Sequence, residues 1–159
     1  MPRADLDAID RKILTALQER ARMPNVELAR AVGLSPSPCL RRVRALEDGG
    51  VIRRYATLVD QSAVGLPVSV FVSVSLERQI ESVLEEFEAT VKARPEVMEC
   101  YLMTGTADYL LRIVVSNLEA YERFLKEHLT RISGVNSIQS SFALKQIAYH
   151  TALPLDASE

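Results

Sequence analysis

The sequence has few of the residues that build disulfide frameworks, metal sites or membrane spans. Its 159 residues include two cysteines, two histidines and no tryptophan. Cys39 and Cys100 are too few for a disulfide framework, and no neighbouring Cys or His completes a metal site. No apolar run approaches the roughly 20 residues of a membrane span, and residues 1–10 lack the apolar segment of a signal peptide. These absences predict a cytoplasmic protein without a metal or cofactor.

The net charge of the chain is small, but the charge is unevenly divided. The whole sequence carries −2. Residues 1–60 hold 11 Lys and Arg against 8 Asp and Glu, whereas residues 61–159 hold 8 against 13. A basic N-terminal part on an acidic remainder is typical of a nucleic-acid-binding module joined to a second domain, although scattered surface charge gives the same numbers. The positions of the arginines decide between these interpretations.

The N-terminal part predicts three helices in the order of a helix-turn-helix. Apolar residues at helical spacing indicate a helix over 6–20 and a shorter one from Pro24 to a C-terminal glycine, Gly33. A third helix, roughly 36–48, begins after Ser35, because a serine can cap a helix while the proline after it occupies the first turn. A helix, a short glycine-containing turn and a second helix match the spacing of this motif.

The third helix has the composition of a helix that contacts DNA bases. Its predicted inner face is formed by Leu40, Val43 and Leu46, and two short strands over 51–54 and 56–59 are expected to form a wing after it. Arginines concentrate on this helix and wing, at Arg41, Arg42, Arg44, Arg53 and Arg54. Arginine can pair with guanine or neutralise phosphate, which favours DNA binding. The alternative is a three-helix bundle whose arginines form only a solvated face.

The C-terminal part contains an internal repeat. Residues 61–65 are interpreted as a hinge. Strict alternation then predicts a strand, and the pattern continues as two β-α-β units. The expected elements are strand 68–76, a helix from Ile80 to Val91, strand 97–104, strand 109–115, a helix from Leu118 to Leu129 and a long strand 135–149. This order predicts a ferredoxin-like β-α-β-β-α-β sandwich. Two helices cover only one face of its sheet, so the face with Phe71 predicts a dimer.

A glycine-containing loop joins the second and third strands of this repeat. It reads Thr104-Gly105-Thr106-Ala107-Asp108. A glycine leaves room for a ligand, and an aspartate can accept a hydrogen bond from an ammonium group. A hairpin turn favours the same residues, and on the residues alone this simpler explanation is preferred.

Taken in order, these stretches resemble the Lrp/AsnC family of feast/famine regulators. The matching residues run along nearly the whole chain: Leu6-Asp7 with Ile9-Asp10, Arg11-Lys12-Ile13-Leu14, Glu27-Leu28-Ala29, Gly33 through Val43, Leu46-Glu47, Gly50-Val51-Ile52, Tyr55, Gly105 with Asp108-Tyr109-Leu110-Leu111, Gly134-Val135 and Thr151 through Leu155. The leucine-serine-proline run at the start of the third helix is the most specific of them.

The resemblance implies a winged helix-turn-helix followed by a RAM domain, which binds an amino-acid effector. It also implies dimers through the RAM sheets, often assembled into octamers, with effectors bound in clefts between dimers. By this resemblance, the residues expected to contact DNA are Ser35, Ser37, Arg41, Arg42 and Arg44. The effector residues carried over are Thr104, Gly105, Thr106, Ala107 and Asp108, with Ser140 and Ser141 closing the cleft from a neighbouring subunit. Many relatives have charged or bulky residues after the glycine, where this chain has Thr106-Ala107. Residues 139–145 resemble those of the relatives that respond to leucine or methionine, which favours one of these as the effector.

The sequence therefore predicts an α+β protein that regulates transcription and is not an enzyme. The expected domains are a winged helix-turn-helix over 1–60, a hinge over 61–65 and a ligand-binding, oligomerising domain over 66–159. The alternative function is an architectural DNA-binding protein without an effector. A small enzyme on the same sandwich is disfavoured, because His128 and His150 lie in no metal-ligand or triad pattern.

Overall fold

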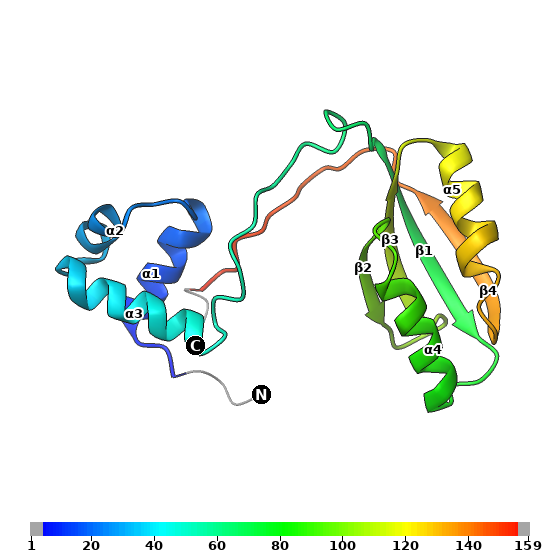
Figure 1. Ribbon diagram of the computed structural model, residues 1–159, viewed down its shortest axis with the longest axis horizontal. Helices are drawn as coiled ribbons and strands as arrows, with labels where there is room; N and C mark the ends of the chain where they lie inside the picture. The colour runs from blue at the N-terminus through cyan, green and yellow to red at the C-terminus, as the bar shows by residue number, and fades with distance from the viewer. Residues whose placement is uncertain (1–4, 156–159) are drawn as a thin grey trace. The chain divides into compact units, whose positions relative to one another are not determined.

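A computed structural model describes residues 5–155, which form two units (Figure 1). The first unit combines the N-terminal residues up to Leu58 with the C-terminal residues from Ala148, and the second spans Val59–Ile147. Each unit has its own apolar core. Within the described residues, no helix is both long and apolar enough to cross a membrane.

Three helices make the N-terminal unit: α1 (Ala8–Glu19), α2 (Asn25–Val32) and α3 (Pro36–Asp48). They meet in a core whose most buried members are Ile13, Leu28, Ala29 and Cys39, each at most 2% exposed. The helix-turn-helix predicted from apolar spacing is confirmed.

The turn between α2 and α3 is fixed by backbone geometry. Gly33 ends α2 in the left-handed region, at φ 75°, where a side chain would be strained. The Leu34 N–H then donates back to the Ala29 carbonyl at 2.8 Å. The Asn25 amide, at the start of α2, donates to the Pro36 carbonyl at 2.9 Å. The first bond closes the end of α2, and the second holds the first turn of α3 against the first turn of α2.

Two details of this unit differ from the sequence prediction. Leu40 does not lie on the inner face of α3: it is 38% exposed, whereas Cys39 is fully buried. The inward positions of α3 are Cys39, Val43 and Leu46, spaced by four and then three residues. Spacings of three and of four both keep residues on one helix face, so the spacing alone does not decide between Cys39 and Leu40. The predicted wing strands over 51–54 and 56–59 are also absent from the described residues, since neither segment has a backbone partner to pair with.

The C-terminal residues complete the N-terminal unit. The Gln18 amide accepts a hydrogen bond from the Leu153 N–H at 2.7 Å and donates to the Leu153 carbonyl at 3.1 Å. The Arg11 guanidinium donates to the Leu155 carbonyl at 3.0 Å, and Leu155 packs against the helical core. The expected second domain ran to residue 159, of which 156–159 lie outside the described residues, and the described chain from Ala148 groups with the helices. We call residues 148–155 the C-terminal tail.

The second unit is a four-stranded antiparallel sheet with two helices. In chain order it contains β1 (Val68–Leu76), α4 (Glu81–Lys92), β2 (Val97–Leu102), β3 (Tyr109–Val115), α5 (Leu118–Phe124), a π-helical turn η1 (Leu125–Leu129) and β4 (Val135–Phe142). The strand order is β2-β3-β1-β4, and every neighbouring pair is antiparallel. This is the ferredoxin-like arrangement that the repeat predicted.

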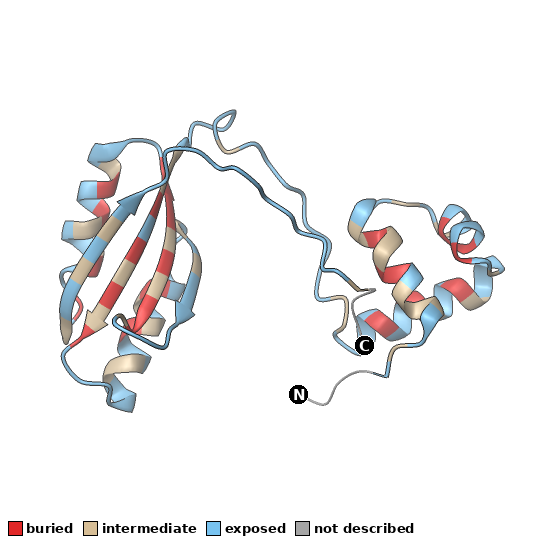
Figure 2. Cartoon of the chain, turned by 180° about the vertical axis from the view of Figure 1, so that it is seen from behind, coloured by how far each residue is buried: buried red, intermediate tan, exposed pale blue. Residues whose placement is uncertain are grey.

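The two faces of the sheet differ. Figures 1 and 2 show α4 and α5 on the same face, where Val70, Val72 and Val74 are buried against residues such as Phe87. Phe71 lies on the opposite face and is 40% exposed. Side chains alternate between the two faces of a strand, and because both helices cover one face, the face with Phe71 has none.

β4 is shorter than the predicted strand 135–149. Its last paired residue, Phe142, lies opposite Val70, and the Ala143 N–H still donates to the Ser69 carbonyl at 3.0 Å. β1 begins at Val68, which by this register lies opposite Leu144, so the chain beyond Leu144 has no strand beside it. The predicted hinge, 61–65, is a turn whose Gln61 amide donates to the Leu66 carbonyl at 2.7 Å.

Candidate functional site

The outward face of α3 presents two arginines in an open depression. Ser37, Leu40, Arg41 and Arg44 line this hollow of about 400 Å³, together with Ala45 and Asp48. Neither Arg41 nor Arg44 forms an ion pair with any of residues 5–155. Leu40 adds an apolar side chain that the sequence prediction placed in the core. The face thus combines unpaired positive charge, a hydroxyl and an apolar group, the groups that contact phosphates and base edges.

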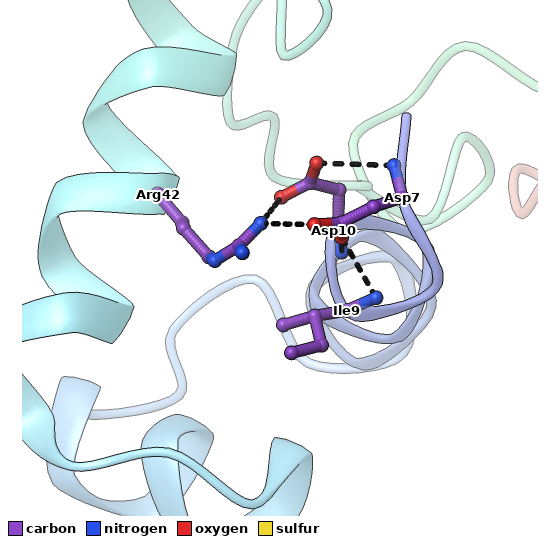
Figure 3. A network of polar contacts seen from close by, with 4 residues as sticks. All are labelled: Asp7, Ile9, Asp10 and Arg42. Atoms are coloured by element: carbon purple, nitrogen blue, oxygen red, sulfur yellow. Dashed lines mark hydrogen bonds and ion pairs between the residues drawn. The ribbon is translucent and has the colours of Figure 1, made fainter. Parts of the chain in front are cut away.

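Arg42, expected on the same face, faces α1 instead. Its Nη1 donates to Asp7 Oδ2 at 2.7 Å and to Asp10 Oδ1 at 2.8 Å (Figure 3). The Arg42 side chain is 32% exposed, whereas the Asp10 side chain is 16% exposed. These bonds raise the pKa of Arg42, and the hydrogen bond from the Asp10 backbone together with Arg42 holds the pKa of Asp7 below its usual value. The guanidinium is engaged within the protein.

After α3, Val51 and Ile52 pack against the helical core, and the following residues, 53–58, are exposed. Arg53 and Arg54 line one wall of a groove of about 860 Å³, together with Tyr55 and members of the C-terminal tail. The Tyr55 hydroxyl donates to the Glu47 carboxylate at 2.8 Å. Burial and this carboxylate raise the pKa of Tyr55 to about 12. Tyr55 therefore ties the arginine segment to the end of α3.

In the second unit, Asp108 is the buried end of the predicted effector loop. Its side chain is 9% exposed. One oxygen accepts from the Leu76 N–H at 2.6 Å and the other from the Gln79 amide at 2.5 Å. Asp108 thereby anchors the end of β1, a role that the sequence did not reveal because Gln79 lies 29 residues away.

In the rest of the loop, Thr104, Gly105 and Thr106 are exposed and Ala107 is half-buried. Gly105 has φ 122°, and open space lies where a side chain would stand. The Thr106 carbonyl accepts from the Ser75 hydroxyl at 3.2 Å. The loop is held after the glycine, at Thr106 and Asp108, and is open at Gly105, so it can offer backbone groups to a ligand.

Ser140 and Ser141 point to opposite faces of the sheet. Ser140 is half-buried, and its hydroxyl shares a hydrogen bond with the Tyr121 hydroxyl on the helix side. Ser141 is exposed and pairs with Phe71 on the open face. Because β1 separates β4 from β3, one chain does not bring these serines together with the 104–108 loop. A site that uses both would need a second copy of the chain.

Several functional contacts escaped the sequence prediction. The Asp7-x-x-Asp10 spacing is that of a capping box, a readable signal, but nothing local indicates that Arg42 reaches both carboxylates. Tyr121, the partner of Ser140, lies within the helix predicted from Leu118 to Leu129, and nothing in the local sequence indicates this contact. Across residues 5–155, no group of three or more His, Cys, Asp or Glu side chains is placed to hold a metal ion.

Two family models match the chain. A winged helix-turn-helix DNA-binding model matches residues 6–53, and the Lrp/AsnC ligand-binding domain matches residues 69–153. Together they cover both units of the structure, in the order that the sequence predicted.

Curated and solved relatives agree with these matches. The Bkd operon transcriptional regulator of Pseudomonas aeruginosa is 49% identical over 152 residues, which cover 96% of this chain and 99% of that protein. The leucine-responsive regulatory protein of Salmonella typhimurium is 42% identical and covers 92% and 89%. A transcriptional regulator from Neisseria meningitidis, solved as an L-Met complex, superposes with a TM-score of 0.90 at 45% identity, covering 95% and 97%. With its helix-turn-helix and its open-faced sheet, this chain belongs to the Lrp/AsnC family of transcriptional regulators, which are not enzymes.

Proposed function

We propose that this protein is a sequence-specific regulator of amino-acid metabolism whose DNA binding is modulated by an amino acid, with leucine or methionine favoured. One observation carries the proposal: a DNA-binding helix-turn-helix and an Lrp/AsnC ligand-binding domain lie in one chain. The ligand preference is supported by relatives named as leucine-responsive or solved with L-Met.

The proposed DNA contacts lie on α3 and the segment after it. Arg41 and Arg44 are exposed and without ion pairs among the described residues, so they can reach guanine or phosphate. Ser35 and Ser37, at the N-terminal end of α3, can bind phosphate, and Leu40 can pack against a thymine methyl group. Arg53 and Arg54 are proposed to contact the backbone beside the groove. Each phosphate neutralised makes binding more salt-dependent.

The proposed effector site is the 104–108 loop, completed by a second copy of the chain. The loop offers backbone groups around Gly105 and the small side chains of Thr106 and Ala107, which leave room for an aliphatic side chain. We assign Asp108 mainly to holding the loop, because both of its oxygens are already engaged. Ser140 and Ser141 would approach from the neighbouring copy. The open sheet face with Phe71 is the proposed dimer surface, and dimers are proposed to assemble into octamers.

The proposed regulation is thermodynamic linkage between effector and DNA. An amino acid that binds one assembly better than another shifts the protein toward that assembly. Because DNA contacts several helix-turn-helix units at once, the affinity of the protein for DNA changes with the assembly.

The test is a thermal-shift screen of all twenty amino acids, combined with light scattering. A ligand that binds only the folded protein stabilises it by about 2.7 kcal/mol at a hundred times its dissociation constant. We expect leucine or methionine to raise the melting temperature and to change the oligomer size. If no amino acid does either while DNA binding persists, the alternative, an effector-independent architectural protein, is the better description.

A further inference from the structure

The three arginines of α3 have different surroundings. Arg41 and Arg44 are exposed, and neither has an ion pair within residues 5–155. Arg42 is 32% exposed and uses one guanidinium nitrogen to bind two carboxylates, from Asp7 and Asp10, at 2.7 and 2.8 Å. Charge alone would assign all three arginines to DNA. Their contacts separate Arg42 from the other two.

The two carboxylates belong to a structural turn. Asp7 caps α1 by accepting from the N–H groups of Ile9 and Asp10, at 2.9 and 2.8 Å. Asp10 completes the capping box by accepting from the Asp7 N–H at 3.3 Å. Arg42 therefore binds a turn whose carboxylates are already oriented, as Figure 3 shows. The trio of Asp7, Asp10 and Arg42 carries one net negative charge, which repels rather than attracts phosphate.

We propose that Arg42 is a positioning residue: it locks α3 to the N-terminal turn of α1 and so sets the orientation in which Arg41 and Arg44 meet DNA. This inference rests on the proposed DNA contacts of α3 and deepens them. Apolar packing between α1 and α3 is non-directional, whereas a guanidinium shared by two carboxylates is directional and bridges residues 32 and 35 positions apart. This contact of Arg42 with Asp7 and Asp10, which we call the clasp, adds a directional constraint to the apolar packing of the two helices.

The test compares Arg42→Gln with a matched control, Arg41→Gln. Binding is measured against two duplexes, one selected from a random pool by the unaltered protein and one of random sequence, over a series of salt concentrations. Arg41→Gln should reduce the salt slope by about 0.9 per DNA-bound protomer, the effect of losing one phosphate contact. Arg42→Gln should keep the slope but lose about tenfold in preference for the selected duplex, the scale of one charge-assisted hydrogen bond.

For a second variant, Asp10→Asn, the clasp and simple charge predict opposite changes in DNA binding. Removing a negative charge from a DNA-binding domain should tighten binding if only long-range electrostatics matters. The clasp predicts the opposite: Asp10→Asn should lose preference for the selected duplex, as Arg42→Gln does, and the double variant should lose little more than either single one. Because Asn retains the size of Asp, this variant keeps the test decisive if Arg42→Gln fails to fold.

The readouts distinguish positioning from stability. Circular dichroism at the assay temperature establishes that each variant is folded, so a change in preference cannot come from an unfolded fraction. A reduced slope for Arg42→Gln together with tighter binding by Asp10→Asn would overturn the proposal and return Arg42 to the phosphate contacts. If the unaltered protein shows no preference for any selected duplex, sequence-specific binding itself fails, which is a different result.

Discussion

Replacing Asp108 should lower the stability of the second unit, because its carboxylate anchors the end of β1. In Asp108→Ala the Leu76 N–H, buried at the end of β1, loses its acceptor at 2.6 Å. A buried donor without a partner costs about 1–3 kcal/mol. The second partner, Gln79, is exposed, so its amide can turn to water at little cost. We therefore expect Asp108→Ala to lower the free energy of unfolding of this unit by about 2 kcal/mol.

Asp108→Asn should cost less, because its amide oxygen can still accept from Leu76. The amide nitrogen would face Gln79, whose own amide can rotate to present its oxygen, so a loss of about 1 kcal/mol is expected. The control is Thr104→Ala at the other end of the loop, where the side chain is exposed and has no hydrogen bond to the described residues. It should leave stability within about 0.5 kcal/mol.

Urea unfolding and hydrogen exchange provide the measurement. Exchange at the Leu76 amide should accelerate in Asp108→Ala more than at Val72, which lies in the middle of β1 and bonds to neighbouring strands. An Asp108→Ala protein with unaltered urea midpoint and unaltered Leu76 protection would refute the anchoring role. Asp108 would then be available as a ligand contact, and the calorimetric response to leucine and methionine would decide that role.

Three further changes follow from single contacts. Tyr121→Phe keeps the buried ring but removes the hydroxyl bonded to Ser140, so the urea midpoint of the second unit should fall by an amount equivalent to about 1 kcal/mol; an unchanged midpoint would mean the bond contributes nothing. Gln18→Ala removes both hydrogen bonds to Leu153 and should speed exchange and proteolysis in the C-terminal tail, unless tail packing alone holds it. Because the pKa of Asp7 is lowered in the folded protein, its contribution to stability is complete above the unfolded-state pKa and is lost as pH falls through the folded-state pKa. In Asp7→Asn the free energy of unfolding should therefore depend less on pH in the acid range, which unfolding measured over a pH series would check.

Elements governed by local rules were predictable from the sequence. β1 spans Val68–Leu76 as its strict alternation indicated, and α3 spans Pro36–Asp48 between its proline start and its glycine stop. Periodicity, caps and turn residues act over a few positions, so a sequence displays them directly. The repeat of two β-α-β units then limits the sheet to very few topologies.

Contacts between distant residues were not predictable in this way. Arg42 has the composition of a DNA contact, and only its distance to Asp7 and Asp10 reveals another role. The end of β4 depends on where β1 begins, and a strand pattern that continues beyond Leu144 has nothing to pair with. Leu40 was placed in the core instead of Cys39 because both residues have helical spacing to Val43, and only the packing of the helices decides between them. Each of these results depends on a contact with residues distant in the sequence, which the local sequence pattern does not indicate.

The C-terminal tail makes the DNA-binding unit discontinuous along the chain, and this has a consequence for its synthesis. Gln18 is made early on the ribosome, whereas its partner Leu153 is made only after the whole of the sheet has been translated. The helices α1 to α3 can fold as they emerge, but their unit is completed last although it is encoded first. A chain that stopped after β4 would carry a finished ligand-binding sheet and an unfinished DNA-binding unit.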